Sequence, residues 1–179
     1  MGSKPASSKV KTRRIEGLTE FQRLLNAVEH GRNPLMGSLL RFAIETGMRR
    51  GELVNARWQF VDWARRTLHI PETKNGHPRT IPLSGEAIRI LRGILDGGHD
   101  SVRIFPLSAN AVRLAWGRLI KRARITNLRL HDLRHEAVSR FFEKGLSVPE
   151  VALISGHRDY RMLARYTHLR PEDVAKKLD

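Results

Sequence analysis

Apolar residues recur at helical spacing in the first third of the chain. The first stripe is made of four apolar side chains, Phe21, Leu24, Leu25 and Val28. Thr19, with Gln22 three residues later, fits a capping box, so a helix that starts at Thr19 is predicted. From Pro34 to Gly47 apolar residues occur on nearly every face, which predicts a buried helix that opens at Pro34 and ends at Gly47. A third helix is predicted over 50–56.

Between residues 58 and 83 the pattern changes to short apolar runs separated by turn residues. Three strands are predicted, over 58–61, 67–70 and 80–83. Asn75-Gly76 lies between the last two and is typical of a β-hairpin. Three prolines keep the strands short or at an edge of the sheet, namely Pro71, Pro78 and Pro82.

Helical patterning resumes after residue 84 and continues to the end of the chain. Helices are predicted over 84–95, 108–124, 130–144, 148–155 and 159–166, and Pro171 opens a last short one. No internal repeat interrupts this order. The sequence therefore predicts a single, mainly helical α+β domain with a small three-stranded antiparallel sheet.

The charge of the chain indicates the kind of partner. The 179 residues include 33 Lys and Arg against 18 Asp and Glu, a net charge of +15. Such an excess indicates an anionic partner, with nucleic acid first and a membrane surface second. Much of the first 14 residues is basic and none is acidic, which predicts a flexible basic tail or linker at 1–14 before a domain at 15–179.

Two absences exclude other classes of protein. The chain has no Cys, which excludes a disulfide scaffold, a Cys-ligated zinc site and thiol catalysis. Apolar runs stay well short of the roughly 18 residues that a membrane span needs, and the N-terminus has no secretory signal. We therefore expect a cytoplasmic protein with no membrane partner.

A first candidate motif surrounds Arg49. Gly47 ends one helix, and Arg49 stands at the start of the next, where unpaired backbone N–H groups suit an anion. Glu52 is three residues further on and can hold the guanidinium in place. On its own, this pair is more typical of an exposed helix start with a routine ion pair.

A second motif is His131-Asp132-Leu133-Arg134-His135. On a helix, residues 131, 134 and 135 share one face, while Leu133 faces the core. The two histidines are spaced as in a zinc site, but Asp132 takes the place of the usual Glu and Arg134 would bring positive charge beside the metal. No metal is therefore expected, and a solvated polar face is the simpler alternative.

A third motif joins a histidine to a tyrosine. Gly156 separates two predicted helices and leaves His157 near a helix start, and Tyr166 lies nine residues later. A lone Tyr is more often a packing residue than a nucleophile. Lys74 stands beside the predicted hairpin turn, where a Lys usually serves solubility.

The order of these signals is more specific than any one of them. Thr-Gly-x-Arg-x-x-Glu-Leu, a hairpin Lys, His-x-x-Arg, Gly-His and a Tyr nine residues later resemble the catalytic domain of the tyrosine recombinase or phage integrase family. The resemblance covers residues 15–169, and 130–168 is similar to integrases of bacterial phages and genomic islands, the shufflon-recombinase-like branch included. It implies the DNA breaking-rejoining fold, without the helical core-binding domain that usually precedes it in the family.

The resemblance also implies roles for individual residues. The catalytic set carried over by position is Arg49, Lys74, His131, Arg134, His157 and Tyr166, with Glu52 supporting Arg49. Tyr166 is expected to attack a DNA phosphate and form a 3′-phosphotyrosine, without metal or cofactor. Tyr160 stands where the family commonly has an aliphatic residue, so we interpret it as packing. Four basic residues are candidates for further DNA contacts, namely Arg158, Lys121, Arg122 and Arg124.

The implied partner is double-stranded DNA with specific recombination sites, and the full-length protein is expected to form a tetramer on it in the bacterial nucleoid. Other functions stay open at this point. A type IB topoisomerase uses the same chemistry, a DNA-binding fragment would keep only the basic surface, and a metal-dependent nuclease would use the His131/His135 pair.

Overall fold

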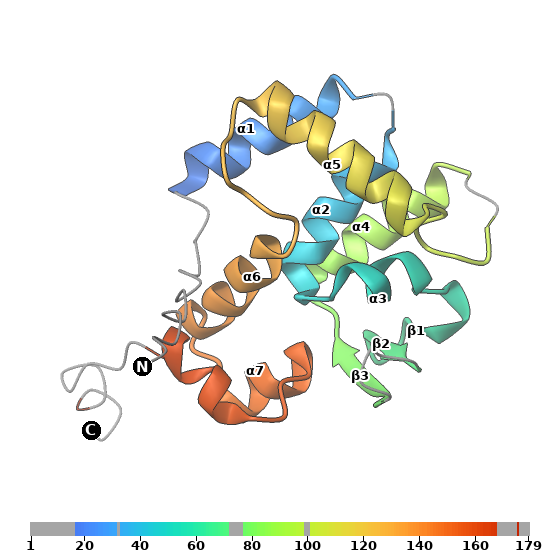
Figure 1. Ribbon diagram of the computed structural model, residues 1–179. Helices are drawn as coiled ribbons and strands as arrows, with labels where there is room; N and C mark the ends of the chain where they lie inside the picture. Colours follow the sequence, from blue (N-terminus) through green and yellow to red (C-terminus); the bar gives the residue numbers. More distant parts are fainter. Residues whose placement is uncertain (1–16, 32, 72–76, 99–100, 168–174, 176–179) are drawn as a thin grey trace, which may run out of the picture.

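The computed structural model describes residues 17–31, 33–71, 77–98, 101–167 and 175. This part of the chain is mainly helical, with one small sheet (Figure 1). Its elements follow in the order α1 (Gly17–Glu29), α2 (Leu35–Thr46), α3 (Arg50–Asn55), η1 (Trp58–Phe60), β1 (Val61–Asp62), β2 (Thr67–Ile70), β3 (Arg79–Pro82), α4 (Gly85–Asp96), α5 (Ala109–Ala123), α6 (Asp132–Glu143), α7 (Val148–Ser155), η2 (Tyr160–Met162) and η3 (Ala164–Tyr166). None of the described helices is both long enough and apolar enough to cross a membrane.

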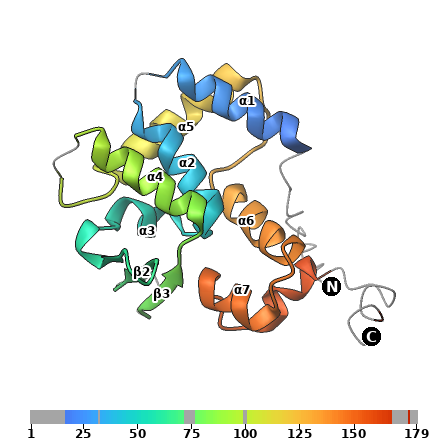
Figure 2. The same ribbon diagram turned by 180° about the vertical axis from the view of Figure 1, so that it is seen from behind.

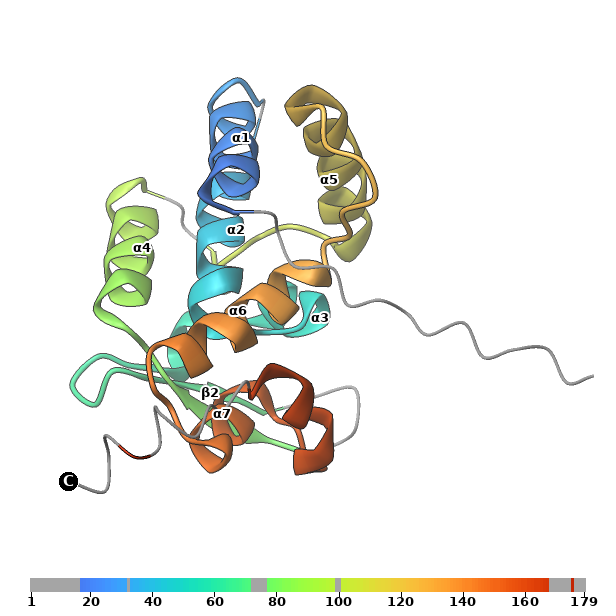
Figure 3. The ribbon, with the colours of Figure 1, turned by 90° about the vertical axis from the view of Figure 1, so that its left-hand side faces the viewer.

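Helix α2 lies at the centre of the larger part of the molecule. It packs against α4 and α6 and contacts α1, which in turn packs against α5. From behind, α4 lies along α2 (Figure 2), and from the side α2 lies between α4 and α5 (Figure 3). Neighbours on several sides explain why apolar residues occupy nearly every face of α2. Its buried residues are Leu35, Met36, Leu39, Leu40, Phe42, Ala43, Ile44 and Thr46.

The sheet is three-stranded and antiparallel, as predicted, and its strand order is β1-β2-β3. Val61 pairs with Leu68, and Leu68 pairs with Ile81, so three buried residues form a row across the sheet. This row anchors the sheet to the core. At the other end of the ladder, Ile70 pairs with Arg79, which places Arg79 at the start of β3 beside α7.

Two hydrophobic clusters make up the core. The larger one unites α1 to α5 with the sheet and includes Leu133 from the first turn of α6. The smaller one is formed by α6, α7 and the segment that follows α7, through Ala137, Val138, Phe141, Val151, Ala152, Ile154 and Leu163. Helix α6 therefore contributes to both clusters, and its polar side chains stand at the junction between them.

Several helix ends lie where the local sequence predicted them. Pro34 immediately precedes α2, and Gly47 ends it in the left-handed conformation with φ of 60°. The Ser84 hydroxyl accepts the Ala87 N–H at the start of α4, and Ser108 caps α5 in the same way. Helix α7 spans the predicted 148–155, with Glu150 completing a capping box.

Two predictions in the N-terminal half of the chain need correction. Helix α1 begins at Gly17, so Thr19 lies in its first turn rather than in front of it, and the predicted start is wrong by two residues. The strand predicted over 58–61 is mostly a 3-10 turn, because the Phe60 N–H bonds to the Arg57 carbonyl at 3.1 Å. Within residues 58–62, only Val61–Asp62 forms a strand, which pairs with β2.

The helix predicted over 159–166 is also wrong. This segment forms two 3-10 turns, because the Asp159 side chain accepts the Arg161 N–H at 2.9 Å and Leu163 is buried between the turns. The tail at 1–14, the Asn75-Gly76 turn and the helix expected from Pro171 fall largely or wholly outside the described residues.

Gly47 is required by its backbone and by its neighbours, which makes a stability prediction. A Cβ at this position would lie 3.3 Å from Cε2 of Phe141, and its φ of 60° disfavours any residue with a Cβ. We expect Gly47→Ala to lower the free energy of unfolding by about 1–3 kcal/mol, as measured by urea denaturation.

Gly117 on α5 is the matched control. A Cβ there meets no atom within 4 Å, and the residue lies inside a helix. Gly117→Ala is expected to raise the free energy of unfolding by about 0.5–1 kcal/mol, because alanine favours the helix. Equal effects of the two substitutions would contradict the strain assigned to Gly47.

Candidate active site

Arg49 and Glu52 meet at the start of α3, at the spacing noted in the sequence. Arg49 precedes the helix in an extended conformation, and its side chain remains 28% exposed. Its Nη1 donates to Oε1 of Glu52 at 3.1 Å, and its backbone N–H donates to Oε2 at 2.8 Å. Glu52 thus satisfies an N–H group at the helix start and holds the Arg49 guanidinium at the same time.

The Glu52 carboxylate also receives two hydrogen bonds from Arg79 on β3. Nη1 of Arg79 lies 2.7 Å from Oε1, and Nη2 lies 2.8 Å from Oε2, so the pair is bidentate. The Glu52 side chain is only 3% exposed. Burial raises the pKa of Glu52, but the hydrogen bonds and charges of Arg79 and Arg49 outweigh it, so the pKa lies below its usual value. The carboxylate is therefore ionised at neutral pH.

Arg134 lies on the first turn of α6 and is 4% exposed. Its Nη1 donates to the Gly47 carbonyl at 2.6 Å, and its Nη2 donates to the Ser155 carbonyl at 2.5 Å. These carbonyls stand at the C-terminal ends of α2 and α7, where the helix dipole favours a cation. Arg134 consequently ties three helices together instead of lying on the solvated polar face considered from sequence.

The surroundings of Arg134 are short of negative charge. Burial lowers its pKa to about 9, and the nearby cations Arg49 and Arg79 lower it in the same direction, while Glu52 opposes them. Arg134 is still protonated at neutral pH. Two of its five N–H groups serve the helix carbonyls, so three remain for an anion.

Two histidines and a tyrosine lie together at the start of α6. The rings of His131 and His135 meet edge to face with centroids 4.8 Å apart. The Tyr166 ring stacks between His135 and Phe142, and its hydroxyl makes a short hydrogen bond to Nδ1 of His135. Burial raises the pKa of Tyr166, so the phenol is protonated at neutral pH.

The pKa values of both α6 histidines are lowered. Burial is the largest cause for each; the charge of Arg134 follows for His131, and the charge of His131 follows for His135. Neutral imidazoles are the result at neutral pH. A neutral His135 that is unprotonated at Nδ1 can accept the Tyr166 hydroxyl hydrogen. No group of three or more His, Asp or Glu side chains in the described ranges is placed to hold a metal ion.

His157 follows Gly156, which ends α7 with φ of 71°. Its Nδ1 lies 2.7 Å from the Ser155 hydroxyl, which also lies 2.6 Å from the Val151 carbonyl. The Ser155 hydroxyl donates its hydrogen to the Val151 carbonyl, so Nδ1 of His157 donates to the Ser155 oxygen, and Nε2 carries a proton only when the imidazole is protonated. Burial lowers the pKa of His157 to about 4, with the charges of Arg134 and Arg49 as the next causes.

Two grooves meet at Arg49. One has a volume of about 620 Å³ and is bounded by β3, α7 and the segment after α7, with His157, Arg158 and Tyr160 in its lining. The other has a volume of about 690 Å³ and is bounded by the start of α3, by α5 and by residues 128–134. Its lining includes five arginines, Arg49, Arg50, Arg113, Arg129 and Arg134. The combined surface is open and strongly basic.

The structure brings together most of the residues singled out in the sequence. Arg49, His131, Arg134, His157 and Tyr166 are coupled through their charges and hydrogen bonds. Lys74 lies outside the described residues. Arg158 is exposed in the first groove.

Tyr160 was interpreted as a packing residue, and this interpretation is wrong. Its side chain is 51% exposed and lines the groove, because the 3-10 turn on which it lies has no buried residue, and Leu163, which follows the turn, packs into the core instead. The chain thus presents a second phenol near the site, which serves as a control below.

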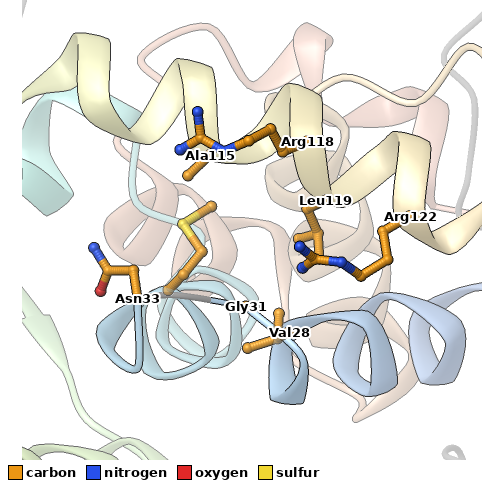
Figure 4. Close-up of a pocket in the computed structure, with 8 residues that line it drawn as sticks. Val28, Gly31, Asn33, Ala115, Arg118, Leu119 and Arg122 are labelled. Carbon is orange, nitrogen blue, oxygen red and sulfur yellow. The ribbon is translucent and has the colours of Figure 1, made fainter.

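The three basic residues predicted at the end of α5 lie elsewhere. Arg122 extends into a third cavity of about 520 Å³ between α1, α2 and α5, where its Nη1 donates to the Ala27 carbonyl at 2.9 Å. Figure 4 shows Arg118 and Arg122 on the α5 side of this cavity, opposite Val28 and Asn33. Lys121, Arg122 and Arg124 are all exposed. Arg122 therefore has an intramolecular contact that its sequence position did not indicate.

Two residues near the site were not recognised from sequence. Arg79 was missed because its partner Glu52 is 27 residues away, and a polar residue on a short strand carries no local signal. His135 was considered as part of a polar face and as half of a metal pair but not as a partner of Tyr166, because that contact spans 31 residues. The spacing of His135 from His131 was the available signal.

Comparison with known proteins agrees with this geometry. The model of the phage integrase family matches residues 18–173. The chain belongs to the phage integrase family. This confirms the family and the fold class expected from the sequence.

Individual members show how the integrase-family chain relates to known proteins. It is 43% identical to the shufflon-specific DNA recombinase of Escherichia coli, over 98% of this chain and 45% of that protein. The catalytic domain of bacteriophage HP1 integrase matches with a TM-score of 0.71 at 25% identity, over 92% of this chain and 93% of that one. The Tn1549 transposon integrase in complex with circular intermediate DNA shares the fold, with a TM-score of 0.79 at 16% identity over 97% of this chain and 67% of that one. The chain spans about half the length of the curated relatives it matches.

The depressed pKa of His157 makes a prediction for the integrase-family chain without DNA. Between the usual value of 6.5 and about 4, the unfolded chain binds this proton more readily than the folded one. Protonation of His157 therefore favours unfolding, and its contribution to stability is lost as the pH falls through this window. In His157→Gln, the free energy of unfolding from urea titrations should change less steeply with pH over that range.

His30→Gln controls for the loss of an imidazole on the exposed end of α1. His131 and His135 remain in both variants and still give a slope of the same sign, because their pKa values are also lowered. A His157→Gln slope as steep as that of the unmodified chain would show that His157 is not desolvated among the arginines.

Proposed function

We propose that this chain is the catalytic domain of a site-specific DNA recombinase, which cleaves and rejoins DNA strands through Tyr166. The observation that carries the proposal is the hydrogen bond between the Tyr166 hydroxyl and His135, close to the charge of Arg134. A phenol with a proton acceptor, beside guanidinium groups that attract a phosphate, is suited to attack a phosphodiester. Membership in the phage integrase family supports the same chemistry.

In the proposed reaction, Oη of Tyr166 attacks the scissile phosphorus, and the bond from phosphorus to the 5′ oxygen breaks. The products are a 3′-phosphotyrosine and a strand that ends in a 5′-hydroxyl. The phenol proton passes to His135, with His131 assisting, and Lys74 supplies the proton that the leaving oxygen takes up. Rejoining reverses these steps with a 5′-hydroxyl from another strand, so the phosphoester energy is retained and ATP is not needed.

Arg49 and Arg134 are proposed to bind the non-bridging oxygens of the phosphate. Planar guanidinium groups suit this geometry, and fixed donors stabilise the charge that develops in the transition state. His157 is proposed to donate from Nε2 to the same phosphate in its protonated form, which a bound anion favours. Burial is the main cause that lowers the pKa values of His157 and Arg134, and nearby positive charge adds to it; an anion bound there would offset that charge and raise both pKa values.

The proposed partner is duplex DNA with specific recombination sites. Four exposed side chains are proposed to contact backbone phosphates, those of Arg158, Lys121, Arg122 and Arg124. The full-length protein is proposed to form a tetramer on DNA at the bacterial nucleoid. Much of the +15 charge would then serve binding that weakens as salt rises.

Trapping the covalent intermediate tests the nucleophile. The probe is a pool of labelled duplexes with a randomised centre and a nick. After cleavage the short strand beside the nick dissociates, and its loss prevents rejoining. The unmodified chain is expected to form an adduct that survives SDS, because Tyr166 becomes covalently linked to DNA. Tyr166→Phe should abolish the adduct, and Tyr160→Phe should retain it.

An adduct that persists in Tyr166→Phe would overturn the assignment. Cleavage that requires a divalent cation and leaves no adduct would instead indicate a metal-dependent nuclease. Sequencing the trapped duplexes identifies the preferred site. Relaxation of supercoiled DNA without strand exchange between two such sites would favour the type IB topoisomerase alternative.

The contact with Tyr166 predicts different roles for His131 and His135. His135→Phe keeps a ring to stack on Tyr166 but removes the proton acceptor, so we expect adduct formation to slow by roughly 100-fold. His131→Phe should slow adduct formation less, because His131 contacts the ring of His135 and would act on the Tyr166 hydroxyl through it. The measurement is the single-turnover rate with an enriched duplex. A normal rate in His135→Phe with a slow rate in His131→Phe would reverse the two roles.

A further inference from the structure

Arg79 is the most completely bonded arginine near the site. All three of its guanidinium nitrogens donate to other parts of the protein: Nη1 and Nη2 to Glu52, and Nε to the Ile154 carbonyl at 3.2 Å. Its side chain is 12% exposed. From the start of β3, Arg79 therefore links the beginning of α3 to the end of α7.

On the α3 side, Arg79 shares a carboxylate with Arg49. Each oxygen of Glu52 accepts one bond from Arg79 and one from Arg49, whose donors are its guanidinium and its backbone N–H. With Arg79 in place, the carboxylate has its two oxygens fixed in orientation and its charge balanced. Without Arg79, a nearly buried carboxylate would be left with Arg49 alone.

On the α7 side, Arg79 packs against the turn that carries His157. A Cβ added to Gly156 would lie 3.1 Å from Cδ, Nε and Cζ of Arg79. Gly156 is therefore required by its φ of 71° and by the arginine that lies against it. The bond to Ile154 holds the last turn of α7 from the same side.

Geometry distinguishes Arg79 from an arginine that binds phosphate directly. Three of its five N–H groups are used within the protein, and Arg49 presents a more exposed side chain to the same groove. A lysine at position 79 would keep the charge, but one ammonium nitrogen cannot reproduce a planar fork with a third, separate bond.

We infer that Arg79 is a positioning residue. It holds Arg49 through Glu52 and His157 through the Gly156 turn, and so fixes these two residues relative to each other. This inference rests on the proposed function, since it assigns both fixed groups to one phosphate. Two groups that must meet a single phosphate depend on their separation, and a misplacement of about 1 Å can cost roughly 100-fold in rate. Arg79 acts on that separation and does not contact the reacting atoms.

The test compares Arg79→Met and Arg79→Lys with the matched control Arg23→Met. Arg23 is also an arginine bonded to backbone carbonyls, those of Ala123 and Arg124, but it joins α1 to the end of α5. For each protein, one assay gives the single-turnover rate of adduct formation at saturating duplex, and fluorescence anisotropy gives the Kd for the same duplex.

Both Arg79 variants are expected to lose on the order of 100-fold in rate, with Kd changed less than about threefold. Arg23→Met should keep the rate of the unmodified chain. Glu52→Gln combined with Arg79→Met should be little slower than the slower single variant, because both changes break the same link. A structural role alone would lower Tm and leave the rate unchanged below the transition.

Hydrogen exchange gives a readout that does not depend on activity. The Gly156 N–H donates to the Ala152 carbonyl, and its exchange should accelerate in Arg79→Lys, while the Val112 N–H on α5 stays protected. This measurement also decides the matter if Arg79→Met does not fold.

Four results would overturn the inference. A normal rate in Arg79→Lys would mean that charge alone suffices. Weaker DNA binding, seen as a higher Kd with a normal rate, would make Arg79 a DNA ligand. The other two results are a change in Tm only and unchanged hydrogen exchange at the Gly156 N–H. An unmodified chain that forms no adduct with any duplex would overturn the proposed function as well, so the two failures are distinguishable.

Discussion

The architecture of the site depends on the hydrogen bonds that Arg134 makes with the ends of two helices. Its guanidinium donates to the carbonyls of Gly47 and Ser155, so the C-termini of α2 and α7 converge on one side chain of α6. These carbonyls have no partner inside their own helices, and Arg134 supplies one together with a charge that suits the helix dipoles. The residues that follow them, Arg49 after Gly47 and His157 after Ser155, are brought to the same place. Fold and site are therefore held by one interaction.

Positive charge is the cost of this arrangement, and the structure balances only part of it. Arg49, Arg79 and Arg134 interact with one another and with a single buried carboxylate, that of Glu52. The carbonyls of helix ends compensate Arg134, and Glu52 compensates the other two. Burial is the largest cause that lowers the pKa values of Arg134 and His157, and the positive charge that remains unbalanced lowers both further. Fixed donors with too little negative charge beside them favour an anion, as the proposed phosphate site requires.

Local patterns in the sequence predicted what local interactions determine. Pro34 and Gly47 bound α2, and the spacing of Arg49 from Glu52 predicted their contact, because each signal acts within a turn of helix. The bidentate bond between Arg79 and Glu52 could not be predicted in this way, because pairing of β3 in the sheet and its packing on α7 create it. The prediction of a helix after α7 was wrong for a similar reason. Burial of Leu163 against α6 and α7 is a tertiary contact, and it overrides the helical periodicity of the segment.

The choice between the two tyrosines shows why a position in the fold matters more than exposure. Tyr160 is the more exposed phenol and lines a groove, whereas the Tyr166 hydroxyl hydrogen-bonds to His135. Tyr166 is half-buried between two rings, and this burial raises its pKa, which by itself makes it a poorer nucleophile. The difficulty is removed if loss of the proton is coupled to attack: His135 receives the proton as the bond to phosphorus forms, and the arginines take up the charge on the phosphate. In the proposed reaction, a phenol held protonated until a phosphate arrives does not react with other electrophiles in the meantime, so the burial that slows the isolated tyrosine would also restrict its reaction to the bound DNA.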